Sequence, residues 1–253
     1  MITGASSGIG ESTARELRRR GWLCVLVARR EELLQALAAD LDGEYEICDV
    51  SDRAAVESMA ARVLERHHAI GLLVNNAGIP ARGTFLSVHP ELIERVMAVN
   101  YLGGVWCTRA LLPGLEAARG EGGAHVVNLA SVAGTVAFAP AGAYAASKHA
   151  QVAFSRSLRA ALAGSGIRVH TVMPGFVETE AFPQRGVLES RLLRRFVIEP
   201  PRVATAIADA VDKDKAEVVV PWFPYRLLAV LQALFPGLIS RFAGMSDYRS
   251  DRV

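Results

Sequence analysis

A tyrosine and a lysine stand four positions apart in the segment Tyr-Ala-Ala-Ser-Lys, as Tyr144 and Lys148. On a helix this spacing places both side chains on one face, so the ammonium of Lys148 can lie beside the phenol of Tyr144. A phenol loses its proton at about pH 10, and a nearby positive charge favours the phenolate. The pair therefore predicts a tyrosine that can exchange a proton near neutral pH. The alternative is an exposed helical face that carries an aromatic and a cation by chance.

Two further polar residues, Asn100 and Ser131, could take part in the same chemistry. A hydroxyl can donate a hydrogen bond to an oxygen that gains negative charge, and an amide can both donate and accept. Taken singly, Ser131 could be a cap at the end of a strand, and Asn100 a helix residue that faces solvent. All four residues follow a glycine-rich turn, and this combination favours a catalytic site over chance placement.

The glycine-rich turn runs from Thr3 to Gly10, with the sequence Thr-Gly-Ala-Ser-Ser-Gly-Ile-Gly. Its three glycines lie between a short strand and a helix, where they suit a tight turn, a close backbone approach to a pyrophosphate and close helix packing. The N-terminus of the helix adds unpaired N–H groups and a partial positive charge. An ordinary glycine-rich loop is the alternative. The turn predicts a dinucleotide site that includes Gly4, Ser6, Ser7, Gly8, Ile9 and Gly10.

The end of the second predicted strand indicates which dinucleotide binds. A carboxylate there favours NAD, whereas an arginine accommodates the 2′-phosphate of NADP. The strand ends Val27-Ala28-Arg29-Arg30 without an acid. The Arg29 guanidinium can form a forked contact with a phosphate and stack on adenine. NADP(H) is therefore favoured over NAD(H), with Arg29 and Arg30 as contacts. The alternative is a solvated helix start whose charge is incidental.

Buried strands alternate with amphipathic helices along the whole chain. Continuous apolar runs predict strands that are covered on both faces. This alternation predicts a single-domain α/β fold, a Rossmann-like doubly wound parallel sheet with helices on both faces. The predicted strands are Trp22–Ala28, Ile70–Asn75, Ala124–Leu129, Ile167–Met173 and Val218–Val220. The predicted helices are Glu11–Arg20, Glu31–Asp40, Arg53–His67, Glu91–Leu112, Tyr144–Ala163 and Arg202–Val211.

Composition excludes several classes of protein. The chain has 253 residues, 51% of them apolar, so it can bury a large core and is too apolar to be disordered. A net charge of +2 and the lack of basic runs interleaved with aromatics argue against a nucleic-acid partner. Adjacent His67 and His68 would diverge on a helix, so no metal site is predicted. The scattered thiols of Cys24, Cys48 and Cys107 are expected to stay free in a reducing cytosol.

Only Met1 and Ile2 precede the glycine-rich turn, which makes the start of the chain unusual. The first strand is therefore expected to be a stub, unless the sequence lacks a few native residues. No signal peptide precedes the turn, and this favours a cytoplasmic location.

In this order the motifs resemble those of the classical short-chain dehydrogenase/reductase (SDR) family, and the resemblance runs from Thr3 to about Pro221. Each landmark is weak alone, whereas their joint occurrence is specific. The resemblance implies an oxidoreductase that interconverts a ketone or aldehyde and an alcohol with NAD(P). The landmarks are Thr3–Gly10, Asp49-Val50, Asn75-Asn76-Ala77-Gly78, Asn100, Ser131, Tyr144, Lys148 and Pro174-Gly175.

The resemblance also implies cofactor contacts beyond the glycine-rich turn. Asp49 corresponds to a position that contacts adenine, with Val50 as a backbone partner. The alternative for Asp49 is a helix cap ahead of Arg53. The other implied contacts are Asn75, Ala77 and Gly78 in the cofactor trough, Pro174, Gly175, Val177 and Thr179 near the nicotinamide, and Tyr144 and Lys148 at its ribose.

Each of the four polar residues gains a role from the family mechanism. In the reductive direction, Tyr144 would donate a proton to the oxygen of a carbonyl substrate while NADPH delivers hydride to its carbon. Ser131 would hydrogen-bond that oxygen. Lys148 would lower the pKa of the phenol and hold the ribose hydroxyls, and Asn100 would hold a water molecule that links Lys148 to solvent. Oxidation of an alcohol is the same path reversed.

Two segments are expected to select the substrate. The segment Phe176 to Pro200 would form a lid, and Thr135, Val136 and Phe138 an opposite apolar wall, which favours a lipophilic ketone or secondary alcohol. Two other functions stay open, namely reduction of 3-oxoacyl groups on an acyl carrier protein and non-catalytic NADP sensing. The lid carries apolar Phe182, Val187 and Leu188, and its cations Arg185, Arg191, Arg194 and Arg195 either meet an anionic tail or form a solvated helix face.

The last segment, residues 222–253, is an apolar tail beyond a dinucleotide-binding and catalytic domain expected at residues 1–221. Pro236-Gly237 interrupts the tail, and its apolar run is too short for the roughly 20 residues of a membrane span. The tail could pack on the same domain, on a second subunit of a homodimer or homotetramer, or on a bilayer surface. An aromatic cluster beside a cation would provide the bilayer contact, through Trp222, Phe223, Tyr225 and Arg226.

Overall fold

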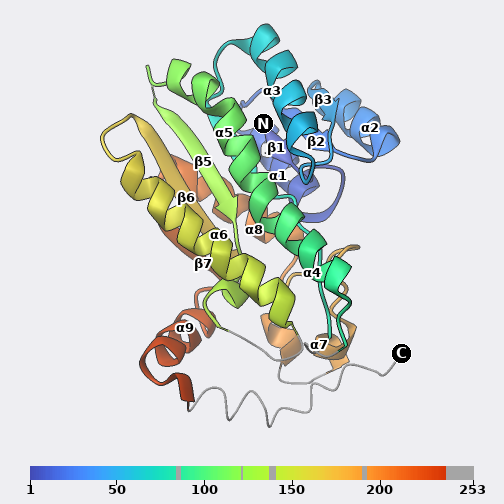
Figure 1. Ribbon diagram of the computed structural model, residues 1–253, viewed down its shortest axis with the longest axis vertical. Coiled ribbons are helices and arrows are strands. Elements are labelled where there is room, and N and C mark those ends of the chain that lie inside the picture. Colours follow the sequence, from blue (N-terminus) through green and yellow to red (C-terminus); the bar gives the residue numbers. More distant parts are fainter. Residues whose placement is uncertain (84–86, 121, 137–140, 190–192, 238–253) are drawn as a thin grey trace.

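One parallel sheet forms the centre of the protein, with helices on both of its faces (Figure 1). The structure is a computed structural model that describes residues 1–83, 87–120, 122–136, 141–189 and 193–237. Seven strands stand in the order β3-β2-β1-β4-β5-β6-β7, which confirms the predicted doubly wound sheet. The strands are β1 Ile2–Thr3, β2 Val25–Ala28, β3 Glu44–Ile47, β4 Leu72–Asn75, β5 Ala124–Leu129, β6 Ile167–Pro174 and β7 Glu217–Val220.

Each face of the sheet has its own buried core. On one face, Leu34 of α2 and Ile207 of α8 pack with Leu17 of α1. On the other face, Met59 of α3 packs with Leu111 of α5. Strands β2, β4 and β5 are buried along their whole length, since helices cover them on both sides. The main helices are α1 Gly8–Arg19, α2 Glu31–Leu41, α3 Arg53–His67, α5 Gly103–Ala117, α6 Gly142–Ala161 and α8 Pro200–Asp212.

The strand order reverses between β1 and β4. From β1 the chain builds the sheet toward β3, and from β4 it builds the sheet in the opposite direction. The loops that leave the carboxyl ends of β1 and β4 therefore diverge. In open sheets of this kind, ligands bind in the crevice at such a switch point.

The predicted strand Trp22–Ala28 begins three residues later than expected. Trp22 leaves the sheet and lies over Gly71, where a Cβ atom would come within 3.1 Å of the indole. Leu23 is 53% exposed, so the first residues of the apolar run lie outside the buried strand. The apolar run is longer than the strand, because its first residues cover the amino end of the sheet and do not pair with a neighbouring strand.

The predicted helix Glu91–Leu112 is divided into three parts: α4 Pro90–Met97, a π-helical turn η1 at Ala98–Leu102, and α5. The wide π turn rotates Asn100 out of the regular helical repeat, and its fully buried side chain bonds the backbone of Ile79. Turns of this type are frequent at functional sites. The periodic apolar pattern continues through the π-helical turn, so the sequence pattern could not reveal the irregularity.

The remaining elements are short and lie near the carboxyl edge of the sheet or in the tail. They are η2 Val132–Gly134, α7 Arg185–Glu189, η3 Leu193–Phe196 and α9 Tyr225–Leu234. Across the part of the chain that the structure describes, no helix combines the length and hydropathy that crossing a bilayer requires.

Candidate active site and cofactor crevice

Tyr144 and Lys148 lie on one face of α6, as their spacing predicted. Lys148 is buried, and its Nζ lies 5.7 Å from the centroid of the Tyr144 ring. Nζ donates to the carbonyl oxygen of Leu129 over 2.9 Å and to Oε1 of Gln151 over 2.7 Å. Burial lowers the pKa of Lys148 to about 7. The lysine is therefore held near the tyrosine, although its hydrogen bonds go to other groups.

The pKa of Tyr144 is raised to about 12 in this structure. Burial is the main cause, and the hydrogen bond between the phenol and Ser131 opposes it. The sequence predicted that Lys148 would lower this pKa, and for this structure that prediction is wrong. Burial removes the water that would stabilise a phenolate, while Lys148 directs its N–H groups to Leu129 and Gln151. The phenol consequently keeps its proton at neutral pH.

Ser131 joins the ends of two strands to α6. It follows β5 and is the N-cap of η2, where its Oγ accepts from the backbone N–H of Ala133 over 3.1 Å. The same hydroxyl lies 3.4 Å from the carbonyl oxygen of Pro174 at the end of β6, and it also meets the phenol of Tyr144. Ser131 is thus a cap, as the alternative reading predicted, and it also contacts the phenol of Tyr144.

Asn100 supports the site from behind Tyr144. Its Oδ1 accepts from the N–H of Ile79 over 2.8 Å, and its Nδ2 donates to the hydroxyl of Ser147 over 3.0 Å. Ser147 in turn donates to the carbonyl oxygen of Tyr144 over 2.7 Å. A Cβ atom on Gly78 would lie 3.4 Å from Asn100 Oδ1 and 3.8 Å from Lys148 Nζ, so Gly78 stands between these two residues. Asn100 does not face solvent, which excludes that alternative.

Two of the mechanical roles that the sequence predicted for the glycines, a tight turn and close helix packing, can be followed in the backbone. Gly4 and Gly8 adopt φ values of +64° and +59°, in the left-handed region that favours glycine. A Cβ atom on Gly10 would collide with the carbonyl oxygen of Gly4, so glycine is required for α1 to pack closely. Ser7 is the N-cap of α1 but gives it no side-chain hydrogen bond. The first N–H groups of α1 are thus left without a side-chain cap at a point where an anion can bind.

Asn75 and Asn76 brace the sheet through their side-chain amides. Asn75 is buried, and its Nδ2 donates to Thr108 and Asn128, over 2.9 Å in each case. Asn76 donates to the backbone oxygens of Thr3 and Gly4, which holds the glycine-rich turn to β4. In this structure the amide nitrogen of Asn75 is therefore engaged by side chains of the protein. Ala77 lies against Gly4, where a Cβ atom would come within 2.8 Å of its Cα.

The two arginines after β2 have different partners. Arg29 forms a 3.4 Å ion pair with Asp49. Arg30 donates to the hydroxyls of Ser6 and Ser7 over 3.1 and 2.5 Å and forms a 3.2 Å ion pair with Glu180 of the lid segment. Arg30 thus connects the end of β2 to both the glycine-rich turn and the lid segment.

Asp49 is not the cap of α3. Its Oδ1 accepts from the N–H and hydroxyl of Ser51, and these hydrogen bonds, together with Arg29, lower its pKa against the opposing effect of burial. Asp52 caps the helix by accepting from the N–H groups of Ala54 and Ala55. Val50 is buried against Gly103. Asp49 is therefore free of the capping role and keeps a half-exposed carboxylate beside Arg29.

The turn after β6 meets both the glycine-rich turn and the tail. A Cβ atom on Gly8 would lie 3.2 Å from Thr179 Cγ2, so this predicted contact faces the turn. Val177 is buried and pairs with Ile198 in an isolated bridge. A Cβ atom on Gly175 would collide with the ring of Tyr225, which packs directly on the Pro174-Gly175 turn. Tyr225 is the one aromatic of the predicted tail cluster that is buried.

The segments predicted to select the substrate are described in part. Phe182 of the lid segment lies 5.7 Å from Tyr144, measured between ring centroids. Val136 and Val187 are buried, whereas Leu188 is exposed. The cations Arg194 and Arg195 face solvent, in agreement with the alternative of a solvated face. Phe138 and Arg191 lie outside the described residues, and of Arg185 only the backbone is described.

Sequence reasoning missed some of the side chains that the fold brings to this region. Gln151 holds Lys148, and Ser147 links Asn100 to α6. Gln151 could have been found from its spacing, because it stands three positions after Lys148, and residues i and i+3 share a helix face. For Glu180 and Tyr225 the sequence held no comparable signal, because their contacts join segments far apart in the chain.

The residues present fit a nicotinamide dinucleotide. Left-handed glycines, a helix start without a side-chain cap and two arginines lie together beside the switch point of the sheet. This donor set suits a pyrophosphate and a further phosphate. The buried lysine and the tyrosine lie at the next strand ends, beside Ser131.

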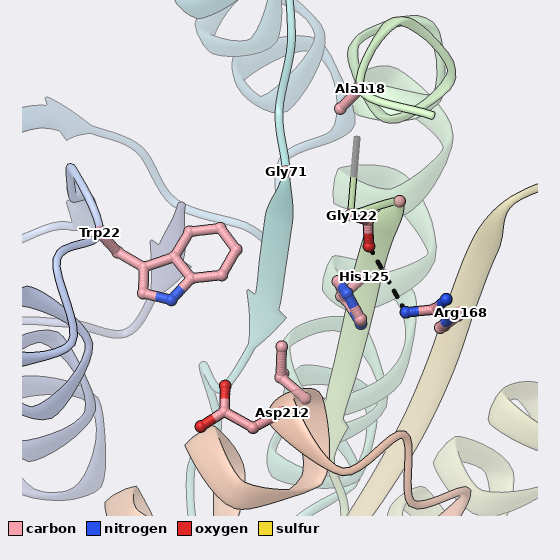
Figure 2. Close-up of a pocket in the computed structure, with 9 residues that line it drawn as sticks. Trp22, Gly71, Ala118, Gly122, His125, Arg168 and Asp212 are labelled. Atoms are coloured by element: carbon pink, nitrogen blue, oxygen red, sulfur yellow. Dashed lines mark hydrogen bonds between the residues drawn. The ribbon is translucent and has the colours of Figure 1, made fainter. Parts of the chain in front are cut away.

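A hollow lies at the opposite, amino edge of the sheet (Figure 2). It has a volume of about 520 Å³ and lies between Trp22, Arg168 and Asp212, with His125 at its base. Arg168 donates to the carbonyl oxygen of Gly122 over 3.4 Å, as the dashed line in Figure 2 shows. None of the sequence-predicted site residues lines this hollow.

Comparison with known proteins identifies the family. The short chain dehydrogenase family model matches residues 1–186. A dehydrogenase/reductase SDR family protein 7-like from Anopheles gambiae is 35% identical over 94% of this chain and 79% of its own length. An actinorhodin polyketide ketoreductase variant solved with NADPH shares 31% identity, with a TM-score of 0.76 over 87% of this chain and 94% of its own.

A short-chain dehydrogenase/reductase from Burkholderia phymatum in complex with NAD reaches a TM-score of 0.81 at 28% identity, covering 94% of this chain and 93% of its own. These structural neighbours thus bind either NADPH or NAD. The match to the family model covers more than half of the chain, and the fold and motifs agree with it. The protein belongs to the classical short-chain dehydrogenase/reductase family, whose members are oxidoreductases that act on CH–OH groups with a nicotinamide dinucleotide.

Proposed function

We propose that the protein is an NADPH-dependent reductase of a lipophilic ketone or aldehyde, with Tyr144 as the proton donor. The observation that carries the proposal is the convergence of Tyr144, Ser131 and Lys148 at the carboxyl edge of the sheet. The phenol of Tyr144 is protonated at neutral pH and can donate to a carbonyl oxygen, whereas burial by itself makes it a weaker acid. A bound nicotinamide supplies the hydride.

The chain's own residues would act on the substrate oxygen. Ser131 would donate to that oxygen as it gains charge, and its position is fixed by the backbone of Ala133. Lys148 would support the tyrosine as a nearby cation when protonated and would hold the ribose of the dinucleotide. Asn100 would fix the start of α6 through Ser147, and a water relay from Lys148 past Gly78 remains part of this proposal.

The test of the reaction is a screen of ketones, aldehydes and secondary alcohols followed by absorbance of the reduced nicotinamide. We expect faster NADPH oxidation with apolar ketones than with sugars, because the apolar ring of Phe182 lies beside Tyr144. Absence of any carbonyl-dependent oxidation across the screen would count against the proposal.

Preference for NADP(H) is supported by Arg29 and Arg30, which provide two guanidinium groups next to the phosphate-binding turn. We expect tighter binding of NADPH than of NADH in a fluorescence titration, and Arg29→Asp should reverse the order because a carboxylate repels the 2′-phosphate. Arg53→Asp is the matched control, since Arg53 is an exposed arginine paired with Glu57 on α3. Equal affinities of the parent for both cofactors would contradict the preference.

A second candidate is reduction of a 3-oxoacyl chain carried by an acyl carrier protein. The likeness to a polyketide ketoreductase favours it, and the exposed Arg194 and Arg195 beside the lid segment offer positive charge to an acidic carrier. A comparison of turnover on a free 3-oxo thioester and on the same group tethered to carrier protein separates the two. Equal turnover on both forms would support the small-molecule function.

The apolar face of α9 supports a peripheral bilayer contact as a further part of the proposal. Trp222 and Leu234 are each 65% exposed, and no acidic residue stands between Val218 and Ser246. Exposed aromatics beside a cation suit an anionic membrane surface, although Arg226 also forms a 3.9 Å ion pair with Glu217 of β7. Pelleting with anionic liposomes should fall when Trp222 and Phe223 are both replaced by serine. Unchanged pelleting would contradict the contact, and a change in sedimentation coefficient would indicate a subunit interface instead.

A further inference from the structure

The ammonium group of Lys148 is held by a neutral side chain. Nζ donates to Gln151 Oε1 over 2.7 Å and to the carbonyl oxygen of Leu129 over 2.9 Å. Gln151 is 2% exposed and lies three positions after Lys148 on α6. An ammonium that donates to a buried oxygen at this distance forms a charge-assisted hydrogen bond. Gln151 is not among the residues of the family motif.

We propose that Gln151 is a positioning residue that sets both the location and the ionisation of Lys148. An ammonium has three N–H donors, and two of them are fixed by Gln151 and Leu129. The two acceptors come from different elements, α6 and the end of β5, so together they restrict the flexible lysine stem. The remaining donor is then available for the ribose or for water. The inference deepens the proposed function and rests on it where turnover is concerned.

The groups that surround Nζ explain why a neutral acceptor matters. Gly78 follows β4, Asn100 comes from η1, Leu129 from β5 and Tyr144 from α6, and at neutral pH each presents an uncharged group. Among the described residues, burial is the influence that shifts the pKa of Lys148, and it lowers that pKa to about 7. Because none of these groups around Nζ is a carboxylate, the Gln151 oxygen is the side-chain group that stabilises the ammonium form of Lys148.

Two substitutions should therefore move the pKa of Lys148 in opposite directions. Gln151→Leu removes the acceptor, so the ammonium is less stable and its pKa falls. Gln151→Glu places a carboxylate at the same point, so the pKa rises, by about one unit or more. A merely structural role for Gln151 predicts that both variants lose activity at every pH, without opposite shifts.

Lysine NMR offers a direct measurement that does not depend on turnover. The chain contains three lysines, Lys148, Lys213 and Lys215, so labelling lysine with ¹³C at Cε gives three signals. Lys213→Arg and Lys215→Arg assign the two that lie outside the site. We expect the Lys148 signal to titrate at lower pH in Gln151→Leu and at higher pH in Gln151→Glu than in the parent. Ser155→Ala is the matched control, because Ser155 is buried on the same helix and bonds Asn128 and Thr171 instead.

The pH dependence of kcat/KM for carbonyl reduction completes the experiment. If the lysine cation is required, the alkaline limb should shift down in Gln151→Leu and up in Gln151→Glu, by about one pH unit each. Unchanged Lys148 titration in both variants would overturn the inference. The expected NMR shifts in a protein with no reductase activity would instead overturn the proposed function alone. Should Gln151→Leu not fold, Gln151→Asn replaces it, because its shorter amide withdraws the acceptor and predicts the same downward shift.

Discussion

Each edge of the sheet holds a pair of titratable side chains, and the two pairs have different partners. At the carboxyl edge, Tyr144 and Lys148 lie beside a glycine cradle and a turn that approaches a lid segment. At the amino edge, His125 Nδ1 lies 2.9 Å from His170 Nε2, and His170 Nδ1 donates to the carbonyl oxygen of Lys215 over 2.8 Å. The histidines use each other and the backbone as partners.

Burial favours the uncharged form at both edges. It lowers the pKa of Lys148 to about 7 and raises that of Tyr144 to about 12, and it also lowers the pKa of both histidines. A perturbed pKa beside a hollow therefore does not distinguish a reaction site from a structural pair in this protein. What distinguishes the carboxyl edge is the arrangement of donors around a crevice that suits an anionic dinucleotide.

The sharpest way to break this comparison is to remove the phenol oxygen. Tyr144→Phe should reduce kcat by about 10²- to 10⁴-fold, because the proton donor is lost while the ring still packs against Phe182. Steady-state kinetics with the best ketone from the screen measures the effect, and a thermal melt controls for folding. Full turnover in this variant would show that Tyr144, like the histidine pair, takes no part in the reaction.

A smaller effect, on stability alone, is expected at the amino edge. His125→Phe leaves His170 Nε2 without its buried partner, which should cost about 1–3 kcal/mol of unfolding free energy. Turnover at neutral pH should stay at the parent level. Denaturant unfolding and kinetics measure the two quantities, and a selective loss of turnover in a variant that remains folded would show that the amino edge contributes to the reaction.

The same substitution should flatten the acid dependence of stability. Because the folded pKa of each histidine is lowered, the unfolded chain takes up protons first, at about pH 6.5. The pair therefore contributes its full stability above that pH, and the contribution is lost as the pH falls toward the folded values. Arg168 and Asp214 face the pair and oppose each other, since the cation lowers and the carboxylate raises the histidine pKa.

The smallest effect should come from the link between the lid segment and the phosphate-binding turn. Glu180→Gln removes an ion pair whose carboxylate is 71% exposed, so the change should stay within about 1 kcal/mol, or roughly fivefold in binding. We expect NADPH to bind slightly tighter, because Arg30 is no longer shared with Glu180. Fluorescence titration measures the affinity, and a weakening beyond tenfold would show that Glu180 supports the cofactor site.

The overall fold could be predicted from the sequence because its strands are buried on both faces and carry continuous apolar runs. Ala124–Leu129 and Arg53–His67 were predicted with their observed bounds. Strand β3 received no predicted range, because its sequence Glu-Tyr-Glu-Ile lacks an apolar run. Its Glu46 is paired with Arg62 and Arg66 of α3, a long-range contact that a local pattern does not contain.

The candidate site was predictable where chemistry follows local spacing. The glycine-rich turn and the pair Tyr144 and Lys148 depend on contacts within a few residues, and the structure places them as expected. The direction of the Tyr144 pKa shift was not predictable, since it depends on burial by distant segments such as the one that carries Phe182. The hydrogen bonds of Asn75 to Thr108 and Asn128 were not predictable, because a motif does not show which way a side chain points.

The contact of Tyr225 with Gly175 ties α9 to the turn that follows β6. The Tyr225 hydroxyl also meets the backbone of Phe176 and Phe196, so one side chain joins three segments. A cut in the chain just before Tyr225 would separate this contact from the core and leave the Pro174-Gly175 turn without the ring that packs on it.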